Sequence, residues 1–164
     1  MKTLFFLLIS SLLIFSTQSR PIISRPQPLS SLKINATQNP ATCSFRVRIR
    51  TSCSSPRYTR DRISLAFGDA YGNQVYAPRL DDPYSGTFER CSTDTYRIYG
   101  PCTYEICYLY LYRSGYDGWI PYDVTVSGYN TGTVTFYYNI PIPRDIWYGY
   151  NDCYDVYAAS LAVK

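Results

Sequence analysis

Six aspartates that lie in or beside predicted loops could bind Ca²⁺. They are Asp61, Asp69, Asp81, Asp82, Asp94 and Asp117. Calcium takes about six to eight oxygen ligands, and loops at one end of a β-sandwich can bring carboxylates together. Turn formation is the competing interpretation, because Asp side chains accept hydrogen bonds from nearby backbone amides in turns. Asp61 and Asp94 are the preferred calcium candidates, on grounds given below, and the turn interpretation stays open.

A row of arginines is the second candidate site. Arg46, Arg48 and Arg50 alternate with apolar residues, so their side chains share one face of a predicted strand. Three more arginines follow: Arg57, Arg60 and Arg62. Guanidinium groups suit phosphate and carboxylate, so this surface could contact anionic lipid headgroups or acidic polysaccharide. Ion pairing with carboxylates on neighbouring strands is the alternative.

Tyrosines form the third candidate surface. In residues 107–112 tyrosine alternates with cysteine or leucine, so one face of the predicted strand is apolar and the other carries phenol rings. Such rings, Tyr110 and Tyr112 above all, could stack on sugars or lie at a membrane interface. The aromatic surface is expected to comprise Tyr108, Tyr110, Tyr112, Tyr116, Tyr148 and Tyr150. Aromatic packing between neighbouring strands is the alternative.

The residue types argue against an enzyme. The chain contains no histidine, which excludes Ser-His-Asp and Cys-His catalysis and every histidine-ligated metal centre. The adjacent Asp81 and Asp82 diverge on an extended backbone, which does not suit the paired carboxylates of glycoside hydrolysis. We therefore predict a non-enzymatic protein with no required cofactor, calcium being the one ion that the loop carboxylates could hold.

Charge is unevenly distributed along the chain. The first 60 residues hold nine basic residues and no acidic one, whereas the remainder holds twelve acidic and seven basic residues. The net charge of the whole chain is +4. The predicted domain is therefore mildly acidic with a basic N-terminal edge. A charge this modest, behind a secretory signal, argues against nucleic acid as the partner.

The N-terminal region precedes the predicted domain. Residues 1–19 have the basic start, apolar stretch and small-residue cleavage site of a secretory signal peptide, which predicts an extracellular protein. Residues 20–42 are rich in proline and polar residues and predict a flexible arm. Within it, Asn35 begins an Asn-Ala-Thr acceptor for N-glycosylation. The domain is predicted over residues 43–153, followed by a tail over 154–164.

Six cysteines follow the signal peptide, and an even number in a secreted chain predicts disulfides. They are Cys43, Cys53, Cys91, Cys102, Cys107 and Cys153. Strand phase favours Cys43 with Cys107, and loop positions favour Cys53 with Cys91, which leaves Cys102 with Cys153. Cys43 with Cys153 is nearly as favoured, because it would close the termini. A zinc site is a weak rival without histidine or a CxxC pair.

The pattern of short apolar and alternating segments predicts an all-β fold. Strands are expected at 43–51, 62–68, 74–78, within 87–99, at 107–113, 119–127, 133–140 and 146–150. Turn signals separate them every eight to twelve residues or so, which is typical of an antiparallel β-sandwich. In the 119–127 strand, Tyr122, Val124 and Val126 are expected to share one face. Trp119, directly after a turn, is expected in the core.

Three runs of sequence resemble the plant embryo-specific protein 3 (ATS3) family. They are TRDRISLAFGDAYGNQVYAPRLDDP at 59–83, TFERCSTDTYRIYGPC at 87–102 and ICYLYLYRSGYDGW at 106–119. The family is similar to a divergent PLAT/LH2 domain, a sandwich of two four-stranded sheets. The PLAT frame is matched by Thr59 to Asp61, by Phe88 with Asp94 and Tyr96, and by the strand that leads to Trp119. Cys91 stands where many PLAT domains have glycine.

The resemblance implies a PLAT/LH2-like β-sandwich of about eight strands that acts as a binding module. PLAT/LH2 domains contact lipids, membranes or proteins, some through calcium, and Asp61 and Asp94 match their calcium-loop positions best. The expected function is lipid, membrane or protein binding in seed or embryo development, with the protein in the apoplast or cell wall. The alternative is a cell-wall carbohydrate-binding protein that uses the exposed tyrosines and the arginine row.

Overall fold

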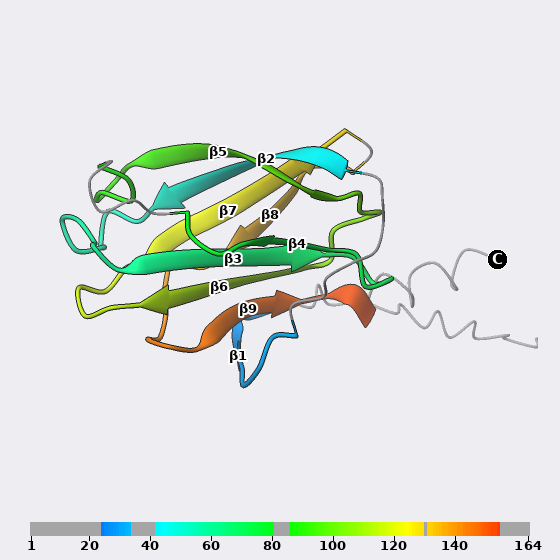
Figure 1. The fold of residues 1–164 in the computed structure, drawn as a ribbon. Coiled ribbons are helices and arrows are strands. Elements are labelled where there is room, and N and C mark those ends of the chain that lie inside the picture. The colour runs from blue at the N-terminus through cyan, green and yellow to red at the C-terminus, as the bar shows by residue number, and fades with distance from the viewer. Residues whose placement is uncertain (1–23, 34–41, 81–85, 130, 155–164) are drawn as a thin grey trace, which may run out of the picture.

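The computed structural model describes residues 24–33, 42–80, 86–129 and 131–154, which form a two-layer β-sandwich (Figure 1). Its strands are β1 (Gln27–Leu29), β2 (Thr42–Thr51), β3 (Arg62–Gly68), β4 (Gln74–Ala77), β5 (Thr93–Pro101), β6 (Tyr108–Ser114), β7 (Pro121–Gly128), β8 (Val134–Tyr137) and β9 (Trp147–Asn151). One sheet has the order β1-β9-β6-β3-β4 and the other β5-β2-β7-β8. All the ladders between these strands are antiparallel, which confirms the predicted fold class.

Alternation of side chains builds the core between the two sheets. Phe45, Val47 and Ile49 of β2 are buried, and their neighbours in sequence point to solvent. Leu109 and Leu111 of β6 face them from the other sheet, as the period of two requires. Trp119 is also fully buried, and its indole Nε1 donates to the Thr51 hydroxyl (3.1 Å), so its only polar atom is satisfied.

A bulge changes the predicted face of β7. The ladder between β2 and β7 keeps one register as far as Arg50, which stands opposite Asp123, and then shifts, so Thr51 stands opposite Pro121. The extra residue, Tyr122, is exposed. The prediction that Tyr122 shares one face with Val124 and Val126 is therefore wrong, because a bulge breaks the period of two.

Part of the predicted N-terminal arm is structured. Gln27, Pro28 and Leu29 form β1, which pairs with β9 at the edge of the five-stranded sheet. The Ser24 hydroxyl also donates to the Asp152 carboxylate (3.1 Å), which ties the arm to the end of β9. A proline suits this place because an edge strand can leave one side of its backbone unpaired. The predicted signal peptide, Asn35, Asp81, Asp82 and residues 155–164 lie outside the described residues.

Three disulfides stabilise the sandwich, as the sequence predicts. They join Cys43 to Cys102, Cys53 to Cys91 and Cys107 to Cys153. The Cys53–Cys91 prediction is confirmed. The Cys43–Cys107 and Cys102–Cys153 pairings are wrong, and so is the alternative Cys43–Cys153.

The reason lies in which strands are neighbours. Cys43 lies opposite Gly100 in the β2–β5 ladder, two residues before Cys102. Tyr108 lies opposite Asn151 in the β6–β9 ladder, so Cys107 and Cys153 lie just beyond the paired residues. Strand phase shows which face a cysteine occupies, but it does not show which strand lies beside it.

None of the segments described in the structure is a helix with the length and hydropathy needed to cross a bilayer.

Candidate functional site

The outer face of the β5-β2-β7-β8 sheet carries exposed arginines. Arg46 and Arg48 project from β2, and Arg97 of β5 stands directly opposite Arg46. All three side chains are exposed, and among the described residues no carboxylate lies within ion-pairing distance of them. Arg48 stands between Thr95 of β5 and Thr125 of β7, so its cross-strand neighbours are uncharged. We call Arg46, Arg48 and Arg97 the arginine face.

The third arginine of the predicted row is used differently. The Arg50 guanidinium forms an ion pair with the buried carboxylate of Asp123, through Nε at 2.9 Å and through Nη2. It also lies 4.6 Å from the centre of the Tyr122 ring. The hydrogen bond with Asp123 raises the pKa of Arg50 above its ordinary value. Arg50 therefore forms an ion pair with a neighbouring strand, which is the alternative interpretation given above for the arginine row.

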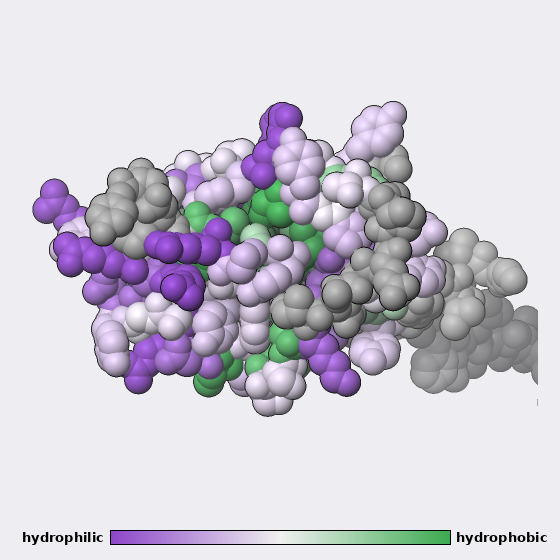
Figure 2. All heavy atoms as spheres, viewed as in Figure 1, coloured by the Kyte–Doolittle hydropathy of each residue, from purple (hydrophilic) through white to green (hydrophobic). Residues whose placement is uncertain are grey.

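The other predicted basic residues lie away from the arginine face. Arg57 and Arg60 belong to the loop between β2 and β3, at one end of the sandwich, and Arg62 begins β3 in the other sheet. Figure 2 shows hydrophilic side chains gathered at this end of the molecule. The Arg60 guanidinium lies 5.3 Å from the centre of the Tyr58 ring. The six arginines therefore do not form one continuous surface.

The tyrosine face of β6 lies on the outside of the opposite sheet, and only part of it is accessible. Tyr110 is buried, with its ring centre 6.1 Å from that of Tyr108, whereas Tyr112 is half-buried. The Tyr112 ring contacts Trp147 of β9 (5.3 Å between ring centres), and Trp147 contacts the exposed Tyr76 of β4 (6.1 Å). Tyr76, Tyr112 and Trp147 form an aromatic platform across this sheet.

The predicted aromatic surface is wrong at its β9 end. Tyr148 and Tyr150 stand opposite Leu111 and Leu109 and so point to the inside of the sandwich. The Tyr150 ring packs against Tyr138 (5.2 Å between ring centres) and is buried, and its hydroxyl donates to the Tyr137 carbonyl. Burial raises the pKa of Tyr150 to about 12. The arginine face and the aromatic platform thus lie on opposite outer faces, and the structure does not join them into one site.

Asp61, a predicted calcium ligand, is a buried structural carboxylate. It forms an ion pair with the buried Arg113, and it accepts hydrogen bonds from the amides of Asp117 and Gly118 (both 3.0 Å). Burial acts to raise the pKa of Asp61, but the two amides and the guanidinium outweigh it and leave the pKa below its ordinary value. Gly115, at φ +148°, lies against the same carboxylate and leaves no room for a Cβ. Both carboxylate oxygens are therefore occupied by the fold.

Asp94, the second predicted calcium ligand, has its own partners. Its carboxylate accepts hydrogen bonds from the Phe88 amide (3.1 Å) and the Ser92 hydroxyl (3.2 Å), which shape the turn before β5. Cys91 in this turn has φ 63°, a conformation that favours glycine, which is what many PLAT domains have near this position. Among the residues that the structure describes, no group of three or more His, Cys, Asp or Glu side chains could hold a metal ion.

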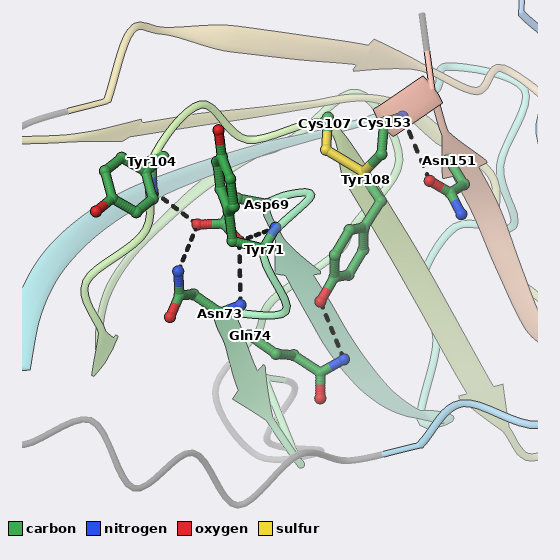
Figure 3. The surroundings of a disulfide bond; sticks show 9 residues. All are labelled: Asp69, Tyr71, Asn73, Gln74, Tyr104, Cys107, Tyr108, Asn151 and Cys153. Carbon is green, nitrogen blue, oxygen red and sulfur yellow. Dashed lines mark hydrogen bonds between the residues drawn. A yellow bond between two sulfur atoms is a disulfide. The ribbon is translucent and has the colours of Figure 1, made fainter. Parts of the chain in front are cut away.

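A second buried aspartate organises the opposite end of the sandwich (Figure 3). Asp69 accepts hydrogen bonds from the amides of Tyr71 (2.9 Å), Asn73 (3.0 Å) and Tyr104 (2.8 Å), and from the Asn73 side chain (2.8 Å). The first two partners lie in the β3–β4 turn, and Tyr104 lies between β5 and β6. Turn formation, the competing interpretation for the loop aspartates, thus describes Asp69 well.

Sequence reasoning missed Arg97, Arg113, Asp123 and Trp147. Arg113 could have been found, because it continues the inward phase of Leu109 and Leu111, where a charge needs a buried partner. Arg97 gives no comparable signal, since its place opposite Arg46 depends on the pairing of β5 with β2.

Comparisons with known proteins identify both the fold and the family. The domain is similar in fold to a coral 8R-lipoxygenase, described as activated by calcium through a C2-like domain (TM-score 0.53, 18% identity, 64% of this chain and 16% of that one). It is also similar to Clostridium perfringens alpha-toxin (TM-score 0.55, 17% identity, 73% of this chain and 34% of that one). The fold is a PLAT/LH2-like sandwich, as predicted.

The sequence relatives are much more similar. The chain is 54% identical to embryo-specific protein ATS3B of Arabidopsis thaliana, over 92% of this chain and 80% of that protein. It is 51% identical to embryo-specific protein ATS3A of the same plant, over 92% and 84%. The model of the embryo-specific protein 3 family matches residues 30–153. The chain therefore belongs to the embryo-specific protein 3 (ATS3) family.

Proposed function

We propose that this protein is a secreted, non-enzymatic binding module that contacts anionic membrane surfaces, or an anionic protein surface, through the arginine face. The family name supports a role in seed or embryo development, and the residues of the signal peptide support an apoplast or cell-wall location. The observation that carries the proposal is that Arg46, Arg48 and Arg97 are exposed together without a carboxylate partner among the described residues.

Electrostatics supports an anionic ligand. Arg46 and Arg97 stand directly opposite each other on neighbouring strands, and like charges in this arrangement destabilise a sheet. A phosphate or carboxylate between them would remove that repulsion and accept N–H donors from both guanidinium groups. The nearby Asp123 does not serve this purpose, because it is buried and paired with Arg50.

Removing two arginines from this face should weaken binding to anionic vesicles. Each arginine near an anionic membrane contributes about 1 kcal/mol, so the Arg46→Ala/Arg48→Ala variant should bind phosphatidylserine vesicles about 30-fold less tightly. Vesicle co-sedimentation at several salt concentrations measures this, and affinity should fall as salt rises.

The matched control removes the same charge elsewhere. Arg25→Ala/Arg62→Ala changes two exposed arginines that lie off the arginine face and should retain most of the affinity. Equal losses in the two double variants would mean that net charge alone drives binding. Binding that does not respond to salt would refute the proposal.

A carbohydrate ligand is the second candidate, favoured by the aromatic platform of Tyr76, Tyr112 and Trp147. Aromatic contacts are worth roughly 1 kcal/mol, so Trp147→Ala should reduce retention on a responsive polysaccharide about fivefold. Affinity electrophoresis through gels containing pectin, xyloglucan or soluble β-glucan tests this. Arg46→Ala/Arg48→Ala, on the opposite face, is the control for neutral glycans, and the candidate fails if no polysaccharide retards the protein.

A further inference from the structure

The exposed surface of the described residues is rich in tyrosine. Of the eleven large hydrophobic side chains that are exposed in the described residues, ten are tyrosines. Two of them lie in contact: the ring centres of Tyr71 and Tyr104 are 5.0 Å apart, with the ring planes at 61°. Each ring is about two-thirds exposed, at 67% and 66%. An exposed aromatic pair at this separation is accessible to solvent and to an enzyme.

The backbone, and not only the ring contact, holds these two residues together. The amide of Tyr71 donates to one oxygen of the buried Asp69 carboxylate, and the amide of Tyr104 donates to the other. Figure 3 shows both residues converging on this one side chain. Since Tyr71 lies in the β3–β4 turn and Tyr104 between β5 and β6, Asp69 brings together phenols that are 33 positions apart in the chain.

The chain offers an oxidant few other targets on its surface. All six cysteines are in disulfides, histidine is absent, and the single methionine is Met1. Of the two tryptophans, Trp119 is fully buried and Trp147 is half-buried. The exposed tyrosines are therefore the principal oxidisable groups on the described surface.

We propose that Tyr71 and Tyr104 form a site of oxidative modification, at which a haem peroxidase with hydrogen peroxide joins the two rings as dityrosine. Each phenol loses one electron and one proton, and the two phenoxyl radicals form a carbon–carbon bond between positions ortho to the oxygens. The hydrogens on those carbons then move to the oxygens, which restores both phenols. Hydrogen peroxide accepts the two electrons and two protons and becomes two molecules of water.

The other tyrosines compared here lack one of the two requirements, which are contact between the two rings and exposure to solvent. Tyr138 and Tyr150 are as close, at 5.2 Å between ring centres, but both are buried and out of reach of an enzyme. Tyr116 and Tyr129 are the most exposed tyrosines in the described residues, at 91% and 93%, but neither contacts another tyrosine ring there. Among the described residues, neither has a tyrosine ring in contact with which its radical could couple. Proximity and exposure coincide at Tyr71 and Tyr104.

The bond would act as a fourth covalent cross-link of the fold. It would join the β3–β4 turn to the β5–β6 connection, at the end of the sandwich that holds the Cys43–Cys102 and Cys107–Cys153 disulfides. Unlike those disulfides, a carbon–carbon bond resists reduction. Such an oxidant would act in an oxidising compartment, where disulfides are also maintained.

The test treats the full mature chain, at low concentration, with a haem peroxidase and hydrogen peroxide. We expect monomeric protein that gains dityrosine fluorescence, loses the mass of two hydrogen atoms and yields a cross-linked peptide pair containing Tyr71 and Tyr104. Tyr71→Phe and Tyr104→Phe keep the ring packing but cannot form the radical, so each should abolish the monomeric product. Tyr116→Phe is the matched control and should leave its yield unchanged.

The outcome is decided within the monomer fraction. The proposal is overturned if that fraction contains no dityrosine, if dityrosine forms only in covalent dimers, or if the monomer of either phenylalanine variant still gains dityrosine. Thermal melting of each variant before treatment verifies that the fold is intact. Yield in the monomer should also be independent of protein concentration, because the reaction is intramolecular.

Discussion

Replacing Asp61 with alanine should destabilise the sandwich by about 3–5 kcal/mol, because it leaves a buried cation without its partner. The Arg113 guanidinium pairs with Asp61, and its remaining contacts are the carbonyls of Ile142 (2.9 Å) and Gly115 (3.3 Å). The substitution also removes the acceptor for the amides of Asp117 and Gly118. Urea denaturation monitored by tryptophan fluorescence measures the loss, since Trp119 directly follows this loop.

The same carboxylate predicts how stability depends on pH. The pKa of Asp61 is lower in the folded chain than in the unfolded one, so the unfolded state binds more protons in the acid range. Its contribution is therefore complete above the unfolded pKa, near 3.8, and is lost as pH falls through the folded pKa. Asp61→Asn should show a flatter decline of unfolding free energy with acid than the parent chain.

Two controls separate this ion pair from a general effect of charge. Asp145→Ala removes an exposed carboxylate that pairs with the exposed Arg144 (3.4 Å) and should change stability by about 1 kcal/mol or less. Asp61→Leu combined with Arg113→Met should cost less than the sum of the single substitutions, because no unpaired charge remains. Additive losses would contradict the buried pair.

Removing the Cys107–Cys153 disulfide should cost about 4 kcal/mol, the loop-closure value for residues 46 positions apart. This bond joins the start of β6 to the end of β9, next to the last paired residues of that ladder. The Cys107→Ala/Cys153→Ala variant should fold, with a lower urea midpoint and no free thiol, because the other four cysteines remain paired.

A second double variant tests the connectivity itself. Cys43→Ala/Cys107→Ala removes one partner from each of two disulfides and should leave Cys102 and Cys153 as free thiols. Thiol titration of the unfolded, unreduced protein distinguishes the two variants. If this variant titrates no thiol while Cys107→Ala/Cys153→Ala titrates two, the connectivity described above is incorrect.

Much of the strand pattern was predictable because a strand alternates its side chains with a period of two, whatever surrounds it. Alternation in Phe45, Val47 and Ile49 predicts their burial, and the structure buries all three. The same alternation places Arg46 and Arg48 on the outside. Both results need only local geometry and the preference of apolar groups for the interior.

Predictions failed wherever the answer depended on a neighbouring strand. Tyr110 has the phase of an outward residue, yet it is buried at its place in the β3-β6-β9 sheet, opposite Ala66 and Gly149. Arg50 shares the phase of Arg46, but the pairing of β2 with β7 places it opposite Asp123, with which it forms an ion pair. Neither contact has a local signal in the sequence.

The candidate sites divide in the same way. The all-β class, the basic strand and the family resemblance follow from the sequence alone, since each rests on local pattern or residue type. The tertiary structure alone decides that Asp61 and Asp69 are occupied by the fold, that Arg97 joins Arg46, and that Tyr71 meets Tyr104. These contacts join residues far apart in the chain, and strand order, not local pattern, determines which distant residues meet.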